Sequence, residues 1–272
     1  MPFLPLLSSV LAFASLLFCG SVWGEGARAW DLSVGIGVAA LPRYSGAAAT
    51  SPRLRVWADA EYRTQSLGSL ALDSGSLTID PELRWNVVDR PDMGFGPLLG
   101  YRFGRTDQNP RFTSSTDGSS RLEGLPDVGS SFDAGLQGHL SMLGVPAFAQ
   151  VRSALRGTQG TLLNIGLYLP LLPEQTFSLT VLPTATWADA KQMRALYGVS
   201  SDASSASGFP AYSPSGGWAS AAVEVVGEWH VSRAGRIVAN FAWERLLDGA
   251  ASSPLVQSKN QLSVLGGVTW SF

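Results

Sequence analysis

The sequence has 272 residues, of which 45% are hydrophobic and 15% charged, and its formal net charge is -2. This composition offers no basic surface for a nucleic acid, so we expect no nucleic-acid partner. The 30 glycines, 16 prolines and 9 tryptophans favour strands, because glycine and proline destabilise helix interiors while aromatic residues favour strands.

The apolar run at residues 3–18 is typical of a signal peptide, because it is too short to span a membrane as a helix. The following Ala27-Arg28-Ala29 fits a small-x-small cleavage site. We expect cleavage after Ala29, with Gly24 as the alternative. The chain is therefore predicted to consist of a signal peptide at residues 1–29 and one domain at residues 30–272.

The N-terminal run departs from the usual signal peptide in one respect, since it has no Lys or Arg before the apolar stretch. Cys19 as a lipoprotein anchor is the rival interpretation, which the bulky Phe18 disfavours. Cys19 is also the only cysteine, so a cleaved chain would have no thiol chemistry. After residue 29 no apolar stretch is long enough for a transmembrane helix.

Both ends of the predicted domain alternate between apolar and polar residues. At the C-terminal end, Val264, Trp270 and Phe272 fall on one face of a strand, while Ser263 and Ser271 fall on the other. Residues 30–38 alternate in the same way. A half-buried strand of a soluble sandwich would show this pattern too. The position of the charges therefore has to distinguish a soluble sandwich from a membrane barrel.

Charged residues keep to one face of the predicted strands, opposite the apolar face. Such a face is wrong for a dry core, because unpaired buried charges are costly, but it suits the polar lumen of a barrel with a lipid-facing apolar band. We expect these charges to pair across the lumen and leave at most a constricted path. The predicted lumen charge network consists of Arg53, Arg55, Asp59, Glu61, Asp80, Glu82, Arg84, Arg102, Asp133, Arg152, Glu224, Glu228 and Glu244.

Twelve segments have the length of roughly nine to thirteen residues that tilted membrane strands require. The third, at residues 67–72, has the weakest pattern. The predicted strands begin near Trp30, Pro52, Leu67, Ser76, Gly94, Val128, Val145, Thr161, Thr176, Trp218, Arg236 and Asn260.

The connections between these segments alternate between short and long. Short turns are expected at residues 63–66, 89–93, 141–144, 171–175 and 232–235, on the side of both termini. The long connections, residues 105–127, 188–217 and 247–259, all fall on the opposite side. Short periplasmic turns and long extracellular loops are typical of bacterial outer-membrane barrels. We therefore predict an all-β, closed antiparallel transmembrane barrel of about twelve strands in the cell outer membrane.

The last strand is expected to close the sheet and to carry the assembly signal. Trp270 and the terminal Phe272, preceded by alternating apolar residues, resemble the ending that the barrel assembly machinery reads. We also expect the barrel to contact outer-membrane lipid and lipopolysaccharide.

Several stretches resemble the MipA/OmpV family, whose name comes from MltA-interacting protein. The resemblance covers nearly all of the mature chain. It is carried by "LPRYSGA" (41–47), "GYRFGR" (100–105), "LEGLPDVGSSFDAGLQG" (122–138), "WADAKQMRALYGVS" (187–200), "SGFPAYSPSGG" (207–217) and "ERLLDGAASSPLV" (244–256).

The resemblance implies an outer-membrane barrel that acts as a scaffold, bringing a lytic transglycosylase and a penicillin-binding protein together in cell-wall maintenance. The family also includes porin-like and adhesive members. A narrow channel for small solutes or a surface adhesin is therefore the alternative function.

A catalytic function is not expected. His139-Leu140-Ser141 and His230-Val231-Ser232 have a His-x-Ser spacing that places both side chains on one strand face, as in barrel lipid A deacylases. No acidic or amide residue follows to orient either imidazole, so we expect no catalytic residues. Two histidines and one cysteine make no ligand cluster, so we expect no metal and no cofactor.

The longest connection is expected to contain a flexible, solvated segment at residues 200–207, because small polar residues bury too little area to become ordered. The nearby Phe209 and Tyr212 are expected to fold into the barrel mouth or to contact a surface ligand.

Overall fold

The structure is a computed structural model that describes residues 30–64, 68–105, 120–142, 144–173 and 176–272. The predicted signal peptide lies outside these residues. In the described part of the chain, no helix is long and apolar enough to cross a membrane.

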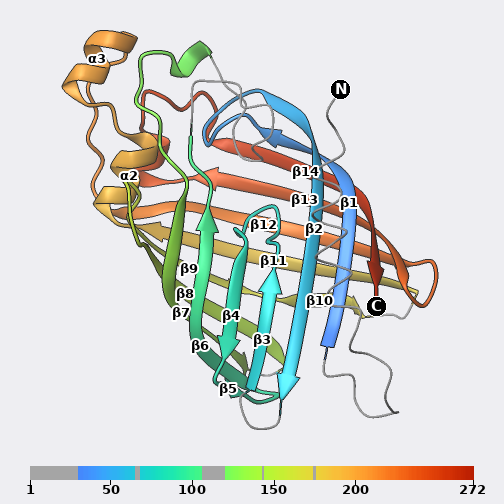
Figure 1. Cartoon of the computed structure of the whole chain (residues 1–272). Coiled ribbons are helices and arrows are strands. Elements are labelled where there is room, and N and C mark those ends of the chain that lie inside the picture. The colour runs from blue at the N-terminus through green and yellow to red at the C-terminus, as the bar shows by residue number, and fades with distance from the viewer. Residues whose placement is uncertain (1–29, 65–67, 106–119, 143, 174–175) are drawn as a thin grey trace, which may run out of the picture.

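Strands make up most of the described chain (Figure 1). The strands are β1 (Trp30–Pro42), β2 (Thr50–Thr64), β3 (Gly68–Asp73), β4 (Glu82–Asn86), β5 (Val88–Asp89), β6 (Met93–Arg102), β7 (Ser131–Met142), β8 (Val145–Ala154), β9 (Thr161–Leu167), β10 (Leu169–Pro173), β11 (Phe177–Ala188), β12 (Gly217–His230), β13 (Gly235–Leu246) and β14 (Asn260–Ser271). The short helices are η2 (Ser120–Leu122), α2 (Ala190–Tyr197), α3 (Ser201–Ser207) and α4 (Asp248–Ala251).

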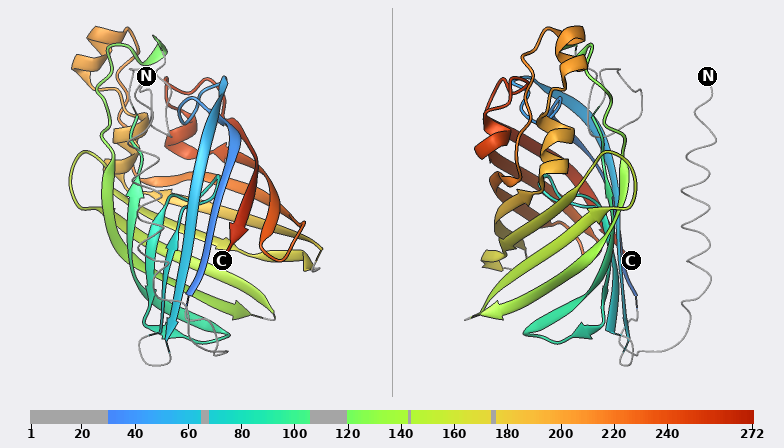
Figure 2. Two further views of the ribbon diagram at one scale, coloured as in Figure 1. Left: turned by 45° about the vertical axis from the view of Figure 1, so that its right-hand side comes forward. Right: turned by 90° about the vertical axis from the view of Figure 1, so that its left-hand side faces the viewer.

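These strands form one closed antiparallel barrel, as the sequence predicts (Figures 1 and 2). β4 and β5 both pair with β6, and β9 and β10 both pair with β11, so each pair acts as one interrupted strand and the barrel has 12 strands. The first and last strands close the sheet, with Ser33 opposite Ser271 and Ala40 opposite Val264. Closure satisfies the backbone groups that an open sheet edge would expose to lipid.

The two faces of the sheet have opposite chemistry. Large apolar side chains point outward, and Leu54 is 70% exposed although it lies in the middle of a strand. Polar and charged side chains point inward, where Asp133 and Glu224 are 0% exposed. An apolar outer band around a polar lumen is the arrangement that a lipid bilayer selects, because lipid rather than water surrounds the outward face. The predicted inside-outside assignment is confirmed.

The predicted third strand is present, whereas the fourth begins later than predicted. β3 pairs with both β2 and β4. β4 begins at Glu82, not near Ser76, because residues 74–81 turn into the barrel interior; we call them the inward segment. Gly75 has a φ of 81°, in the left-handed region that favours glycine, and its N–H donates to Asp73 Oδ1 at 2.8 Å. This turn ends the strand before the apolar-polar alternation of the following residues can continue it.

Among the described residues, the connections alternate as predicted, and parts of those predicted at residues 63–66, 105–127, 141–144 and 171–175 lie outside the described residues. Short turns and both ends of the described chain lie at one end of the barrel, the turn end, and the long connections lie at the other, the loop end (Figure 1). By the usual pattern of outer-membrane barrels, the turn end faces the periplasm. The expectation of a flexible segment at residues 200–207 is wrong, because α3 occupies most of it. Ser200 caps this helix by accepting a hydrogen bond from Ala203 N at 3.2 Å.

Candidate functional site

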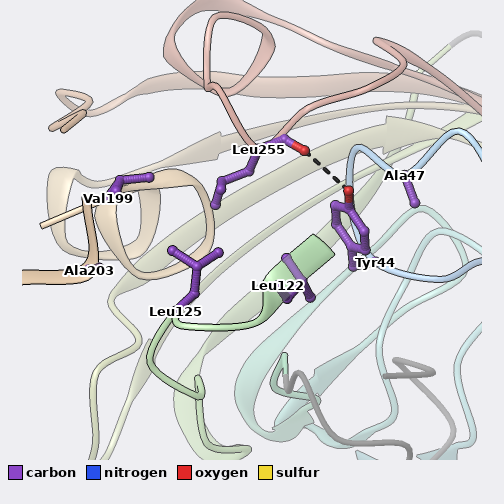
Figure 3. Packing of buried hydrophobic residues seen from close by; sticks show 7 residues of the cluster. All are labelled: Tyr44, Ala47, Leu122, Leu125, Val199, Ala203 and Leu255. Carbon is purple, nitrogen blue, oxygen red and sulfur yellow. Dashed lines mark hydrogen bonds between the residues drawn. The ribbon is translucent and has the colours of Figure 1, made fainter. Parts of the chain in front are cut away.

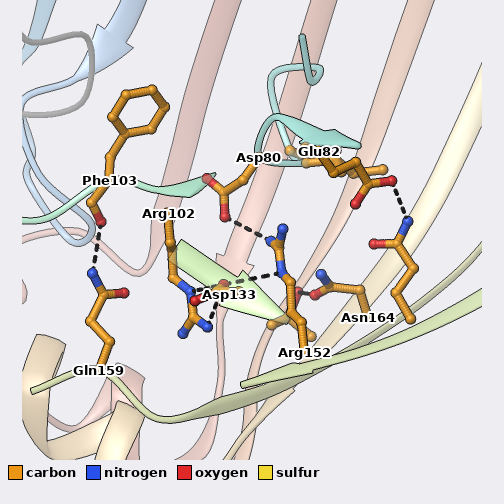
Figure 4. A network of polar contacts seen from close by, with 12 residues as sticks. Asp80, Glu82, Arg102, Phe103, Asp133, Arg152, Gln159 and Asn164 are labelled. Carbon is orange, nitrogen blue, oxygen red and sulfur yellow. Dashed lines mark hydrogen bonds and ion pairs between the residues drawn. The ribbon is translucent and has the colours of Figure 1, made fainter. Parts of the chain in front are cut away.

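One cluster of buried charges in the lumen belongs to the neighbouring strands β6, β7 and β8 (Figure 4). Arg102 donates to Asp133 Oδ2 from Nε at 2.8 Å and from Nη2 at 2.6 Å. Arg152 lies on the other side of this carboxylate, with its Nε 3.9 Å from Asp133 Oδ2. Two guanidiniums thus compensate one fully buried carboxylate, which offsets part of its desolvation cost.

Arg102 is also held from the loop end of the barrel, by Gln192 of α2. Asp189 caps this helix by accepting from Gln192 N at 2.7 Å, and the cap fixes Gln192 over the lumen. Gln192 Oε1 then accepts from Arg102 Nη1 at 2.7 Å and from Gly160 N at 2.9 Å. A Cβ at Gly160 would lie 2.1 Å from Asp189 Oδ1, so only glycine permits this close approach.

A second part of the site surrounds the start of β4. Arg152 Nη2 donates to Asp80 Oδ2 at 2.7 Å, which joins β8 to the inward segment. Glu82 accepts from Gln150 Nε2 at 2.7 Å and lies 3.4 Å from Arg84 Nε. Figure 4 shows the Asp80 carboxylate pointing toward Arg152 of β8.

The inward segment crosses the lumen and contacts Glu224 on the far wall. Glu224 lies on β12, which β13, β14, β1 and β2 separate from β3 in the sheet order. Its Oε2 accepts from Ser76 Oγ at 2.8 Å and from Thr78 Oγ1 at 2.9 Å, and its Oε1 accepts from Leu77 N at 3.2 Å. Asn240 Nδ2 donates to Oε1 at 3.2 Å. Neutral donors therefore satisfy a carboxylate that is fully buried.

The near end of the inward segment is held by β2. Asp59 Oδ1 accepts from Ser74 N at 2.8 Å and from Ser74 Oγ at 2.6 Å. Arg84 on β4 pairs with Asp73, the last residue of β3, at 3.2 Å. The segment is thus fixed at its beginning, at its tip and, through Asp80, at its end.

This segment divides the lumen into two cavities. The lower cavity, toward the turn end, has a volume of about 610 Å³ and is lined by Ser74 and Leu77 together with Arg55, Trp57 and Glu228. The upper cavity, toward the loop end, has a volume of about 260 Å³. Thr78 and Asp80 line it, together with Arg105, Asn164 and Glu244. The two cavities share no lining residue.

The loop end is covered by connections that pack into a small hydrophobic core, which we call the cap. Its members come from the connections after β1, β6, β11 and β13 (Figure 3). Phe209 and Tyr212 are partly buried and pack against them. The buried residues of this core are Tyr44, Ala47, Leu122, Leu125, Val199, Ala203 and Leu255. Phe209 and Tyr212 therefore belong to the cap. This agrees with the first of the two expectations for them, that they fold into the barrel mouth.

A second cluster joins the cap to the barrel rim, where Met193 and Tyr197 of α2 pack on Leu162 and Leu246. The Tyr197 hydroxyl lies 2.7 Å from Ser45 Oγ. Burial raises the pKa of the Tyr197 phenol well above its ordinary value, and the charge of Glu244 adds to this effect.

The other predicted lumen residues pair more locally than expected. Glu228 lies 3.4 Å from Arg236 on the neighbouring strand, and Glu61 pairs with Arg63 of its own strand at 2.7 Å. Arg53 Nε donates to Ser51 Oγ at 3.4 Å. Arg55 and Glu244 line the lower and the upper cavity. We expected opposite charges to pair directly across the bore, but it is the inward segment that bridges it.

Several contributors to this site escape sequence reasoning. Gln150, Gln192 and Asn240 are uncharged, and Ser76 and Thr78 occur in what reads as a strand. The one available signal is "SGSLTIDP" at residues 74–81, where a glycine and a proline bracket a short polar segment as they do in turns.

The two His-x-Ser stretches show no catalytic arrangement among their described contacts. Ser232 Oγ accepts from Gly235 N at 2.8 Å and so stabilises the turn between β12 and β13.

Trp270 and Phe272, the predicted assembly signal, are 46% and 49% exposed on the outer face at the turn end. In the residues that the structure describes, no group of three or more His, Cys, Asp or Glu side chains could hold a metal ion.

Similar solved structures include the NanC porin, with a TM-score of 0.44 and 12% identity over 88% of this chain and 98% of that chain. The Pseudomonas putida OprB structure has a TM-score of 0.43 and 9% identity over 89% of this chain and 94% of that chain. No curated protein matches the chain.

The family model described as MltA-interacting protein MipA matches residues 34–272. These residues include every strand except the first four residues of β1. Together with a closed barrel whose outer band is apolar, this match places the protein in the cell outer membrane. The chain belongs to the MltA-interacting protein MipA family.

Proposed function

We propose that the protein is a non-catalytic outer-membrane scaffold that docks periplasmic murein enzymes at its turn end. In this function it brings a lytic transglycosylase and a penicillin-binding synthase together during cell-wall maintenance. The family description, MltA-interacting protein, supports a transglycosylase as one partner.

The observation that carries this proposal is the division of the lumen. A general porin needs a continuous aqueous path, whereas here the inward segment separates cavities of about 610 and 260 Å³. Its anchors on Asp59, Glu224 and Arg152 come from three strands, so the closed arrangement is held by the barrel wall. A closed barrel supports the function of a membrane-fixed platform better than that of an open pore.

Binding of a purified soluble lytic transglycosylase of the MltA type to the folded barrel in detergent micelles tests this proposal. Charge reversal of Arg233, exposed in the β12–β13 turn, should weaken binding. Charge reversal of Arg156, exposed at the loop end, is the matched control and should leave binding unchanged. Absence of binding by the wild type, or equal loss in both variants, would contradict docking at the turn end.

The solute channel remains the alternative function, because both cavities are lined by charged and polar side chains. Planar-bilayer recordings separate the two functions. Stable unitary steps from the wild-type protein, comparable with those of open porins, would favour the channel over the scaffold.

A further inference from the structure

The inward segment is built as a separate element inside the barrel. It belongs to no strand, and within it Ser76 N donates to Ile79 O at 2.9 Å. Residues 74–77 line the lower cavity, while Thr78 and Asp80 line the upper one. Eight residues of backbone thus form the partition, and side chains of the barrel wall hold it in place.

The contacts that hold the two ends of this segment differ from those that hold its tip. At its two ends, Asp59 and Arg152 hold it near β3 and β4, where it is covalently attached. Its tip is held by Glu224 on the far wall, through two hydroxyl groups and one peptide N–H. In the described part of the chain, no ion pair of Glu224 lies within 4.0 Å. Loss of the contact at Glu224 would therefore free the tip while both ends stay attached.

We propose that the inward segment is a gate, and that Glu224 is its latch. When the tip leaves Glu224 and folds back toward β3 and β4, the lower and upper cavities join into one passage through the barrel. The protein then has a second, conditional activity, the passage of small hydrophilic solutes. This activity goes beyond the proposed scaffold function, which does not require the gate to open.

The charges along the joined cavities indicate the class of solute. The lower cavity is lined by five acidic and three basic side chains, and the upper by two acidic and three basic ones. Release of the tip adds the Glu224 carboxylate, so acidic groups outnumber basic ones in the joined passage. Rings of acidic side chains favour cations in channels. We expect small cations to pass more readily than small anions.

Single-channel recording of latch variants tests the gate. Glu224→Ala removes the acceptor, and the double variant Ser76→Ala/Thr78→Ala removes the two hydroxyl donors while leaving the carboxylate in place. Both should raise the open probability at least about tenfold over wild type, and a tenfold change corresponds to about 1.4 kcal/mol in the closed-open equilibrium. In Ser76→Ala/Thr78→Ala, which keeps the Glu224 carboxylate, the reversal potential in a KCl gradient should indicate a preference for K⁺.

Gln137→Ala is the matched control. Gln137 is buried in the lumen and donates to Asn86 Oδ1 at 2.6 Å, but it lines neither cavity, and among the described residues no hydrogen bond joins it to the inward segment. This variant should conduct no more than wild type. Folding of every variant is checked by heat-modifiable mobility on gels.

Three results would overturn the gate. They are folded latch variants that conduct no more than wild type, an equal increase in Gln137→Ala, and a wild type that already conducts as freely as the latch variants. Transglycosylase binding is measured on the same preparations, so failure of the gate is distinguished from failure of the scaffold function.

Discussion

Arg102 on β6 and Asp133 on β7 face each other, and the Arg102 guanidinium donates two hydrogen bonds to the same oxygen, Asp133 Oδ2, at 2.8 and 2.6 Å. Their side chains are 5% and 0% exposed. Because neither group can be solvated, each depends on the other, and removal of one should cost more than removal of both.

We predict that Arg102→Met lowers the free energy of unfolding in lipid vesicles by about 3–5 kcal/mol, because Asp133 loses its principal partner. The double variant Arg102→Met/Asp133→Leu should recover part of this loss. Arg63→Ala is the control, since its pair with Glu61 is 71% and 31% exposed and should contribute less than about 1 kcal/mol. Urea titrations measure all three, and a double variant as unstable as the single one would contradict the argument.

A substitution pair on β14 tests the two faces of the sheet. Val264 is 44% exposed on the outer face, whereas Ser263 points into the lumen. Val264→Arg should cost about 2–4 kcal/mol near the membrane midplane, while Ser263→Arg should be far milder because it meets a polar lumen. Folding titrations in vesicles compare the two. Equal losses, or the reverse order, would show that the faces are assigned wrongly.

The cap should loosen independently of the barrel. Leu255 is 1% exposed in the core of the cap, and its carbonyl accepts from the Tyr44 hydroxyl at 3.2 Å. Leu255→Ala should destabilise the cap locally by about 2–5 kcal/mol and speed protease cleavage of the loop-end connections. Leu155→Ala, at a 60% exposed position of the same end, should leave cleavage unchanged. Loss of heat-modifiable mobility in Leu255→Ala would instead mean that cap and barrel unfold together.

Alkaline pH should also open the cap. The pKa of Tyr197 is raised in the folded state, chiefly by burial, so the folded protein holds this proton more tightly than the unfolded chain. The stabilisation is fully present below the ordinary tyrosine pKa of about 10, and it is lost as pH rises from there toward the folded value.

Protease sensitivity of the cap should therefore increase above about pH 10 in the wild type. Tyr197→Phe should remove the part of this increase that Tyr197 causes, at the cost of the contact with Ser45. A wild type and a Tyr197→Phe variant with the same pH profile would exclude Tyr197 as the titrating group.

The amino-acid sequence by itself determined the barrel. Alternation of the kind seen at Ser263 and Val264 is a local property of each strand, and in lipid it can be satisfied only when every strand pairs and the sheet closes. The strand number, the lipid-facing side and the alternation of short and long connections therefore follow from pattern alone. The weak third segment forms a strand because β2 and β4 provide its partners.

Only the tertiary structure decided what fills the lumen and what covers it. Leu77 and Ile79 alternate with Thr78 and Asp80 as in a strand, but the partner of Ser76 is Glu224, 148 residues away along the chain. Likewise, the serine-rich residues of α3 become ordered because Ala203 packs in the core of the cap. Alternation reports which face of a strand meets lipid. It carries no information on which distant hydroxyl, amide or carboxylate will satisfy a group that has turned inward, because that depends on the packing of the closed barrel.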